Sequence, residues 1–334
     1  MLEDRQAFFT EVALQALEGY GLAGAPYQYL QHSENVTFKV DHPDGGARIL
    51  RIHVPRVPSM GGHGANPEVV KSELLWLEAL RRETDLPVQQ PIRNRREHLV
   101  TRITVDGQRQ FNCSLLEWLE GEPYQREMES EFTVAQLGAI VAKMHHFNDH
   151  WSLPAGYTRP RRDNLYFKRA IQALSPAVED KRIDYQDYKR LETSVELLAK
   201  MMQSLEKTRQ TDGILHGDLH KGNFLYHHGQ MRLIDFSFCA MGNFMLDLGI
   251  CFSDMNPALY PVFLESYQQY MPLPENYQTL IEAFFLGSMV GSFSFWIDLP
   301  EAQEEFVRKV PLIAQEYAAK FNRGERFWFT SGAV

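Results

Sequence analysis

The stretch that decides the fold runs from residue 215 to residue 237 and reads LHGDLHKGNFLYHHGQMRLIDFS. Two glycines, Gly217 and Gly222, interrupt its first half, so this half is expected to be a tight loop rather than a helix. Its second half places two short apolar runs on either side of residues 227–230, which is typical of a β-hairpin. The chain therefore leaves a polar loop, makes one short hairpin and ends the second strand at Asp235.

Among the side chains of this stretch, Asp218, Asn223 and Asp235 offer carboxylate or amide oxygens. Mg²⁺ binds hard oxygen ligands of this kind and completes its coordination with waters and substrate phosphates. Phosphoryl transfer asks for little covalent chemistry from the protein. It needs a positioned acceptor hydroxyl and a cation that neutralises the phosphate charge. The three residues therefore suit a phosphotransferase that uses Mg²⁺ and a nucleoside triphosphate.

Plainer interpretations exist for the same residues. Lone aspartates usually cap helices or turns. Histidines also recur here, at positions 216, 220, 227 and 228, and could suggest a zinc site. However, the sequence contains no H-E-x-x-H motif, and the two glycines argue against a helix that would place two histidines on one face. The hard-oxygen interpretation is therefore preferred.

Length and charge bound the other possibilities. The chain has 334 residues, more than one hydrophobic core usually spans, so two lobes are expected. Its net charge of -9 argues against a surface that holds phosphate backbones, and we expect no nucleic-acid partner. The same charge could favour a cationic substrate, although net charge alone is weak support for one.

Cysteine use and hydropathy bear on the compartment. The three cysteines, Cys113, Cys239 and Cys251, are too few and too scattered for a disulfide framework, which fits a reducing cytoplasm. Residues 1–20 read as an amphipathic helix rather than a signal peptide. The most apolar run, residues 283–297, is shorter than the roughly 18–20 residues that cross a bilayer, so we expect a buried helix and no membrane partner.

The order of elements indicates an α+β protein. In the first third, strands are expected at 27–31, 36–40, 48–54, 99–105 and 109–116, and one helix starts at Asn66-Pro67-Glu68 and ends near residue 82. Apart from the hairpin, the rest is helical, with helices expected at 133–150, 185–207, 257–270, 276–298 and 301–321. This pattern predicts a small antiparallel β lobe, residues 1–116, followed by a large helical lobe, residues 117–334.

The motif H-G-D-L-H-K-G-N, followed by a hairpin and I-D-F, resembles the aminoglycoside phosphotransferase and choline kinase-like family. The text from Asp235 onward is especially similar to a bacterial branch described broadly as the phosphotransferase enzyme family, near type II homoserine kinases and stress-response kinases. The resemblance implies a two-lobed protein-kinase-like fold. It also implies Asp218 as the catalytic base, Asn223 and Asp235 as Mg²⁺ ligands, and His216 and Asp247 as supports of the loop.

The same resemblance places ATP on the β lobe. Ile49 would cover the adenine, and Arg51 would contact the phosphates where most of the family has lysine; Lys39 is the alternative. The acid that pairs with this cation is expected on the following helix, with Glu73 first and Glu68 second.

Two further segments would complete the nucleotide site. Glu117 and Leu119 resemble the hinge whose backbone groups read the adenine edge, and a plain interlobe linker is the other interpretation. Residues 31–36, including Ser33-Glu34-Asn35, would cover the phosphates. This loop lacks G-x-G-x-x-G, and the chain contains no G-x-x-x-x-G-K-[ST], so neither a protein-kinase glycine loop nor a P-loop is expected.

The sequence leaves the phosphate acceptor open. A basic segment, residues 159–162, could hold an anionic acceptor, whereas Trp296 and the acids that follow it, Asp298, Glu301, Glu304 and Glu305, could hold an amine. Both segments could also be ordinary solvated charges. The expected activity is transfer of phosphate from ATP to a small-molecule hydroxyl. The alternatives are a Ser/Thr protein kinase of the stress-response type and a nucleotide-binding pseudokinase, and oligomeric state is not indicated.

Overall fold

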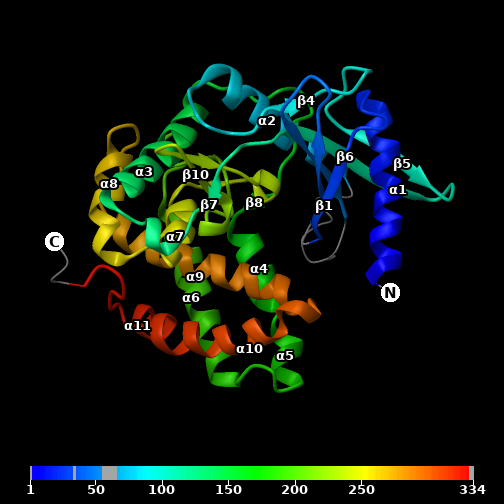
Figure 1. Ribbon diagram of the computed structural model, residues 1–334. Helices are drawn as coiled ribbons and strands as arrows, with labels where there is room; N and C mark the ends of the chain where they lie inside the picture. Colours follow the sequence, from blue (N-terminus) through cyan, green and yellow to red (C-terminus); the bar gives the residue numbers. More distant parts are fainter. Residues whose placement is uncertain (1, 33–34, 55–65, 331–334) are drawn as a thin grey trace. The chain divides into compact units, whose positions relative to one another are not determined.

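The computed structural model describes residues 2–32, 35–54 and 66–330 (Figure 1). The chain divides into two compact units. The first contains Met1–Glu122, Leu153–Arg159 and Arg232–Ser237, and the second contains Pro123–Ser152, Pro160–Met231 and Phe238–Val334. A single division after residue 116, as expected from the sequence, does not include the two later segments that return to the first unit.

The first unit is built on an antiparallel sheet. Its strands are β1 (Tyr27–His32), β2 (Asn35–Asp41), β3 (Ala47–His53), β4 (Pro91–Ile92), β5 (Thr101–Val105) and β6 (Arg109–Glu117). They run in the order β1-β2-β3-β6-β4, and β5 pairs with β6 off this path. All five long strands expected from the sequence are present, because each carries the apolar alternation of a sheet with a buried face.

Helix α1 (Leu2–Tyr20) packs on this sheet. Its apolar residues, such as Val12 and Leu17, join one buried cluster with Phe38, Leu50 and Ile52 of the strands. Since side chains alternate along a strand, Arg51 lies on the opposite face from Leu50 and Ile52. Arg51 therefore points away from the apolar core under α1.

Helix α2 (Pro67–Glu83) begins as the sequence predicted. Asn66 is the N-cap and its side chain accepts a hydrogen bond from the Glu68 N–H at 3.0 Å, with Pro67 in the first turn. One side of α2 is buried and includes Glu73 as well as apolar residues such as Leu74. A buried carboxylate among apolar neighbours requires a partner.

The second unit is mostly helical. Its helices are α3 (Glu131–His146), α4 (Asn164–Gln172), α5 (Ser175–Glu179), α6 (Tyr185–Ser204), α7 (Met245–Asp254), α8 (Tyr260–Gln268), α9 (Tyr277–Trp296), α10 (Gln303–Leu312) and α11 (Ala319–Asn322). Helix α3 packs on α8, and α9 packs on α4, α6 and α7. By length and composition α9 could span a membrane, but 67% of its most apolar window is buried inside the protein. This burial confirms the expected core helix.

Short strands frame the decisive loop. One sheet of the second unit has the order β8 (Arg161–Arg162), β12 (Ala240–Asn243) and β9 (Asp212–Leu215). The hairpin expected after the loop is formed by β10 (Phe224–His227) and β11 (Gln230–Leu233), and β7 (Glu122–Pro123) pairs with β10. β9 therefore leads directly into the loop and β10 leads directly out of it.

Several elements differ from the sequence expectation. The helix expected at 301–321 is divided by a π-helical segment (Ile313–Ala318), which follows Pro311 at the end of α10. Proline has no N–H for the helical ladder, so a change of helix type near it is understandable. Helix α4, α5 and the two-residue strand β8 were not expected, because short elements carry too few residues to show a period.

Candidate active site

In the first unit, Arg51 of β3 forms a buried ion pair with Glu73 of α2. The Arg51 Nη2 to Glu73 Oε1 distance is 2.5 Å, and the two side chains are 5% and 2% exposed. Glu68, the second candidate for this role, is instead exposed and contacts Lys71. The structure therefore brings together the arginine and the acid that the resemblance placed first.

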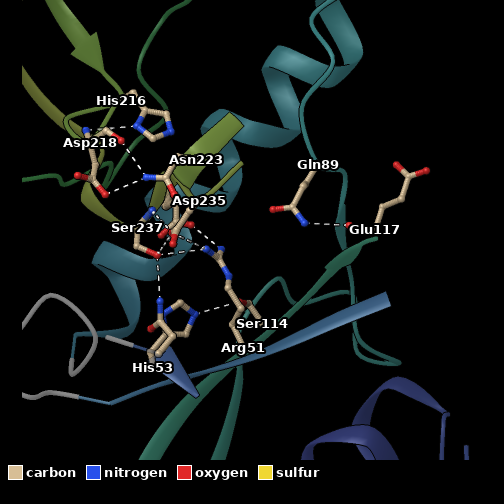
Figure 2. A network of polar contacts seen from close by, with 12 residues as sticks. Arg51, His53, Gln89, Ser114, Glu117, His216, Asp218, Asn223, Asp235 and Ser237 are labelled. Carbon is tan, nitrogen blue, oxygen red and sulfur yellow. Dashed lines mark hydrogen bonds and ion pairs between the residues drawn. The ribbon is translucent and has the colours of Figure 1, made fainter. Parts of the chain in front are cut away.

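Asp235 lies in the same polar cluster. Its Oδ1 is 3.7 Å from Arg51 Nη1 and accepts a 2.6 Å hydrogen bond from the Ser237 hydroxyl. The Ser237 oxygen in turn accepts from Arg51 Nη1 at 3.2 Å (Figure 2). It also accepts from Asn35 Nδ2 at 3.0 Å. Ser237 thus joins a strand-β3 cation to the expected metal ligand, a role that sequence reasoning missed. An aspartate followed two residues later by serine is its only sequence signal.

The backbone at Asp235 has φ of 60°, in the left-handed region that a residue with a Cβ rarely adopts. Bonds from the Ser237 side chain and backbone N–H to Oδ1 stabilise this turn. The described residues contact Asp235 only through Oδ1. Its second carboxylate oxygen is therefore open to a cation.

Arg159 corrects one expectation. The basic segment 159–162 was read either as a grip for an acceptor or as solvated charge, but Arg159 is only 8% exposed. It donates to the Ser237 carbonyl at 2.7 Å and lies 3.9 Å from Glu73 Oε2. Glu73 therefore sits between two arginines, and Arg159 supports the polar cluster of the first unit rather than holding an acceptor.

Lys39, the alternative phosphate contact, lies elsewhere. Its ammonium stands over the ring of Trp118, 4.5 Å from the centroid. Lys39 pairs with Ile49 in the β2–β3 register, and Ile49 is half-buried. These positions favour Arg51 over Lys39 as the cation of the buried cluster.

The hinge segment is only partly open to a ligand. The Glu117 N–H donates to the Gln90 carbonyl at 2.8 Å, and the Glu117 carbonyl accepts from Gln89 Nε2 at 3.0 Å (Figure 2). None of the described residues hydrogen-bonds to the backbone of Leu119. Of the two residues expected to read adenine, Leu119 thus keeps its backbone groups free, while Glu117 can accept only through its second carbonyl lone pair. Ser33 and Glu34 of the expected phosphate loop lie outside the described residues.

In the second unit, the decisive loop brings Asp218 and Asn223 together. The Asn223 amide nitrogen donates to the Asp218 carbonyl at 2.8 Å and to Asp218 Oδ2 at 2.9 Å (Figure 2). Because both amide hydrogens face Asp218, the Asn223 Oδ1 points away from it. Within the described part of the chain nothing donates to that oxygen, so it is suited to a hard cation.

The environment of Asp218 keeps it ionised. Burial raises the pKa of this carboxyl, but the hydrogen bond and charge of His220, the charge of His216 and the Asn223 amide outweigh burial, so the pKa lies below its ordinary value. His220 Nε2 is 3.4 Å from Asp218 Oδ2, and the Asp218 side chain is 32% exposed. An ionised, accessible carboxylate can accept a hydrogen bond from an acceptor hydroxyl, although it is a weak base.

Asp247, at the start of α7, holds the loop from its buried side. Its two carboxylate oxygens accept the backbone N–H groups of His216 and Gly217, each at 2.8 Å. Gly217 has φ of 79°, and a Cβ there would lie 2.5 Å from the Phe238 carbonyl oxygen, so only glycine fits. His216 is fully buried and its Nδ1 accepts from the Asp218 N–H at 3.3 Å. The two residues expected to support the loop therefore contact it.

Behind Asp247, the buried side chains of His145 and Tyr267 form a hydrogen-bonded series that the sequence did not reveal. His145 of α3 contacts Asp247 Oδ2 through Nε2 and the Tyr267 hydroxyl through Nδ1, both at 2.9 Å. Burial, with Asp247 nearby, raises the pKa of Tyr267 well above its usual range, so its hydroxyl keeps its proton. With Nε2 donating to Asp247 and Nδ1 accepting from the Tyr267 hydroxyl, every group in this series is bonded. His145 stands in an apolar helix pattern that gave no hint of this role.

The segments proposed for the acceptor are largely engaged within the protein. Arg161 is ion-paired with Asp212. Glu305 pairs with Arg308 and, at 3.0 Å, with Lys309, whose ammonium stands 5.5 Å from the Trp296 ring centroid. The acid-rich stretch after α9 therefore carries its own cations, which weakens the case for an amine site there.

A β-sheet unit with a buried Arg–Glu pair and a helical unit with a braced H-G-D loop define the class of kinase-like phosphotransferases. Residues 28–279 match the model of the Phosphotransferase enzyme family, and the chain belongs to that family. The predicted family and the predicted α+β kinase-like fold are confirmed, and the protein is a phosphotransferase with a hydroxyl acceptor.

Two relatives illustrate the range of the family. Amicoumacin kinase of Bacillus subtilis (strain 168) is 22% identical over 253 residues, which cover 75% of this chain and 69% of that protein. Homoserine kinase of Neisseria meningitidis serogroup B (strain ATCC BAA-335 / MC58) is 28% identical over 172 residues, 48% of this chain and 50% of that protein.

Solved structures show the same fold. Amicoumacin kinase hAmiN in complex with AMP-PNP, Ca²⁺ and Ami has a TM-score of 0.72 at 18% identity, and the match covers 98% of this chain and 97% of that one. The microcompartment-associated aminopropanol kinase has a TM-score of 0.70 at 20% identity, covering 94% and 98%. At these identities the likeness establishes the fold, not the substrate.

Proposed function

We propose that this protein transfers the γ-phosphate of ATP, with Mg²⁺, to a hydroxyl of a small metabolite. The orientation of Asn223 carries the proposal: its amide hydrogens are spent on Asp218, so a hard-oxygen ligand and an ionised carboxylate lie side by side on one loop. A nucleotide analogue and a divalent cation in the related hAmiN structure support the choice of ATP and a metal.

The proposed roles follow from each environment. Asn223 Oδ1 and the open oxygen of Asp235 would hold Mg²⁺, which neutralises phosphate charge when bound. Asp218 orients the acceptor hydroxyl and accepts its proton, while His216 and Asp247 fix the loop that carries it. These two supports act on position and never meet the substrate.

On the nucleotide side, Arg51, held by Glu73, contacts the phosphates. Ile49 covers the adenine, and the backbone of Leu119, with the second lone pair of the Glu117 carbonyl, reads its edge. The three cysteines are buried and form no disulfide among the described residues, which agrees with a cytoplasmic enzyme.

The acceptor is a small molecule of the amino-alcohol, amino-acid or aminoglycoside-like type. The names of the relatives, an antibiotic kinase, an amino-acid kinase and an amino-alcohol kinase, support this class. A Ser/Thr protein kinase is the second candidate. A pseudokinase is disfavoured because Asp218, Asn223 and Asp235 are all present.

The test is ATP turnover with and without Mg²⁺ over a panel of such acceptors, with phosphorylated products followed by ³¹P NMR. We expect a new phosphate monoester only when Mg²⁺, ATP and one acceptor are all present. Autophosphorylation without stimulation by any small molecule would favour the protein kinase. Binding of Mg·ATP without turnover of any acceptor and without autophosphorylation would favour the nucleotide-binding pseudokinase.

A further inference from the structure

Arg162, at the end of β8 in the second unit, has an unusual environment. The residue as a whole is 6% exposed, yet its guanidinium has no hydrogen-bond or ion-pair partner in the ranges that the structure describes, and none of its nitrogens is fully buried, so the fork is within reach of a ligand. Its one specific contact is a cation–π interaction, with the guanidinium carbon 4.2 Å from the ring centroid of Tyr166. Its neighbour Arg161, by contrast, is ion-paired with Asp212.

Such an environment is costly for arginine. The guanidinium stays charged at any physiological pH and presents five N–H donors. A largely buried guanidinium without an anionic partner loses part of its hydration, and a single cation–π contact offsets only part of that cost. Arginine at such a position is best explained by an anion that arrives from outside the chain, and its planar fork suits a carboxylate or phosphate.

The position of Arg162 ties it to the decisive loop. In the sheet β8-β12-β9, Arg162 is paired with Gly242, and Gly242 is paired with Gly213 of β9. Two strand spacings place the Arg162 backbone about 10 Å from that of Gly213. β9 then continues directly into His216, Gly217 and Asp218. A small acceptor and the long arginine side chain can together span this distance.

Contacts along α9 also connect the environment of Arg162 with the decisive loop. The Tyr166 hydroxyl approaches α9 so closely that a Cβ at Gly291 would lie 2.6 Å from it. One turn on, Phe295 packs edge-to-face against Phe238, with ring centroids 6.2 Å apart. The Phe238 carbonyl is the atom that requires glycine at 217. Aromatic side chains therefore connect the Arg162 environment to the loop that carries Asp218.

We propose that Arg162 binds the anionic group of the phosphate acceptor, and that the acceptor is a small alcohol bearing a carboxylate, such as a hydroxy amino acid. This inference rests on the proposed function and narrows its substrate class. The hydroxyl lies at Asp218 and the carboxylate lies on the guanidinium of Arg162. Arg162 then acts as a specificity residue and takes no part in the proton transfer.

Matched acceptors test the carboxylate directly. Three pairs differ only by this group: L-homoserine and 3-aminopropan-1-ol, L-threonine and 1-aminopropan-2-ol, and L-serine and ethanolamine. For at least one pair, we expect kcat/KM of the carboxylate member to exceed that of its partner by about 10²-fold. In Arg162→Gln the preference should shrink to within about threefold, through loss of activity on the carboxylate member alone.

Thermal stability provides a second test, because replacing an arginine that only stabilises the fold would lower the Tm. Arg162→Met removes a largely buried charge that has no anionic partner among the described residues and keeps the side-chain volume, so the Tm of the ligand-free protein should rise or stay unchanged. Arg161→Gln is the control, because it breaks the pair with Asp212. It should lower the Tm slightly and leave the ratio of kcat/KM within each acceptor pair unaltered.

The outcomes separate the inference from the function on which it rests. Turnover that favours the decarboxylated members, or an equal loss on both members in Arg162→Gln, overturns the inference alone. Bound Mg·ATP with no turnover of any pair overturns it as well, because the acceptor class is then wrong. A clear fall of Tm in Arg162→Met assigns Arg162 a structural role. Failure to bind Mg·ATP at all refutes the proposed function itself.

Discussion

The polar cluster of the first unit and the loop of the second unit differ in how their charged groups are held. In the cluster, the charged groups satisfy one another: Arg51 is paired with Glu73 and lies near Asp235. In the loop, the supports lie behind the reactive groups. Asp247 holds two backbone N–H groups, while the Asp218 carboxylate remains partly exposed. The cluster is therefore suited to binding a charged ligand, and the loop is suited to fixing the position of the Asp218 carboxylate.

This difference has an energetic side. Buried ion pairs contribute little net stability, because desolvation offsets the attraction, but removing one partner leaves an uncompensated charge. Changes in the cluster should therefore alter ligand binding and stability together. Backbone hydrogen bonds to Asp247 position the loop without touching a ligand, so changes there should act on turnover. Four experiments, each with its own measurement, test this difference between the two regions.

The largest effect is expected from Asp218→Asn. The amide keeps the shape of the side chain but cannot accept a proton from the acceptor hydroxyl, so kcat should fall by at least about 10²-fold. The dissociation constant for Mg·ATP, measured by calorimetry, should stay within about threefold, because Asp218 is assigned no nucleotide contact. Near-full activity in this variant would remove Asp218 from its assigned role.

Asp235→Ala in the cluster should have the opposite pattern to Asp218→Asn, because it should act on the binding of Mg·ATP. Loss of a metal ligand should weaken Mg·ATP binding by about 10–10²-fold, the range seen when metal-site residues are altered. Ser237→Ala is the matched control. It removes the hydroxyl that bonds Asp235 Oδ1 but leaves the carboxylate, so its binding should fall less. Unchanged Mg·ATP affinity in Asp235→Ala would count against the ligand assignment.

The two regions also differ in how far the sequence revealed them. The loop is contiguous, so the oxygen-bearing side chains of Asp218 and Asn223 could be read from one motif, whereas the supporting roles of His216 and Asp247 were expected only through the family resemblance. The cluster is assembled from β3, α2 and residues 235–237, which are far apart in sequence. Its arginine–acid pair was expected only through the family resemblance, because no local pattern links Arg51 to Glu73.

What the sequence missed has a common physical cause. Ser237, Arg159, His145 and Tyr267 act through single long-range contacts, and nothing in their local periodicity marks a partner. Arg159 and Arg162 lie in a basic run that resembles a solvated surface, yet both are buried. The strands and long helices were predictable because each repeats one apolar spacing over many residues. Short elements such as β8 carry no such repeat.

Substitutions in the buried side chains behind the loop, His145 and Tyr267, should have an intermediate effect. His145→Phe removes the donor to Asp247 Oδ2 and leaves a buried carboxylate oxygen less satisfied, so kcat should fall about 10-fold while Mg·ATP affinity is unchanged. Tyr267→Phe, one step further away, should cost about 1 kcal/mol of unfolding free energy and change kcat by less than about threefold.

Tyr260→Phe is the control for a lost buried hydroxyl, since this tyrosine donates to the Phe252 carbonyl at 2.9 Å, away from the loop. It should lower unfolding free energy, measured by urea denaturation, about as much as Tyr267→Phe, with no change in kcat. If His145→Phe loses stability but keeps full kcat, then the hydrogen-bonded series is structural and does not position the loop.

The smallest effect concerns pH. The pKa of Asp218 lies below its ordinary value of 3.8, and the active form is the carboxylate, so kcat/KM for the acceptor should show no acid limb from Asp218 down to about pH 5. Burial acts in the opposite direction, and His220 is the strongest group that lowers this pKa. His220→Asn should therefore raise the pKa of Asp218 and move the onset of acid inactivation to higher pH. Initial rates between pH 4.5 and 8 at saturating Mg·ATP measure this shift. An acid limb above about pH 6 that is identical in both proteins would mean that another group controls the reaction.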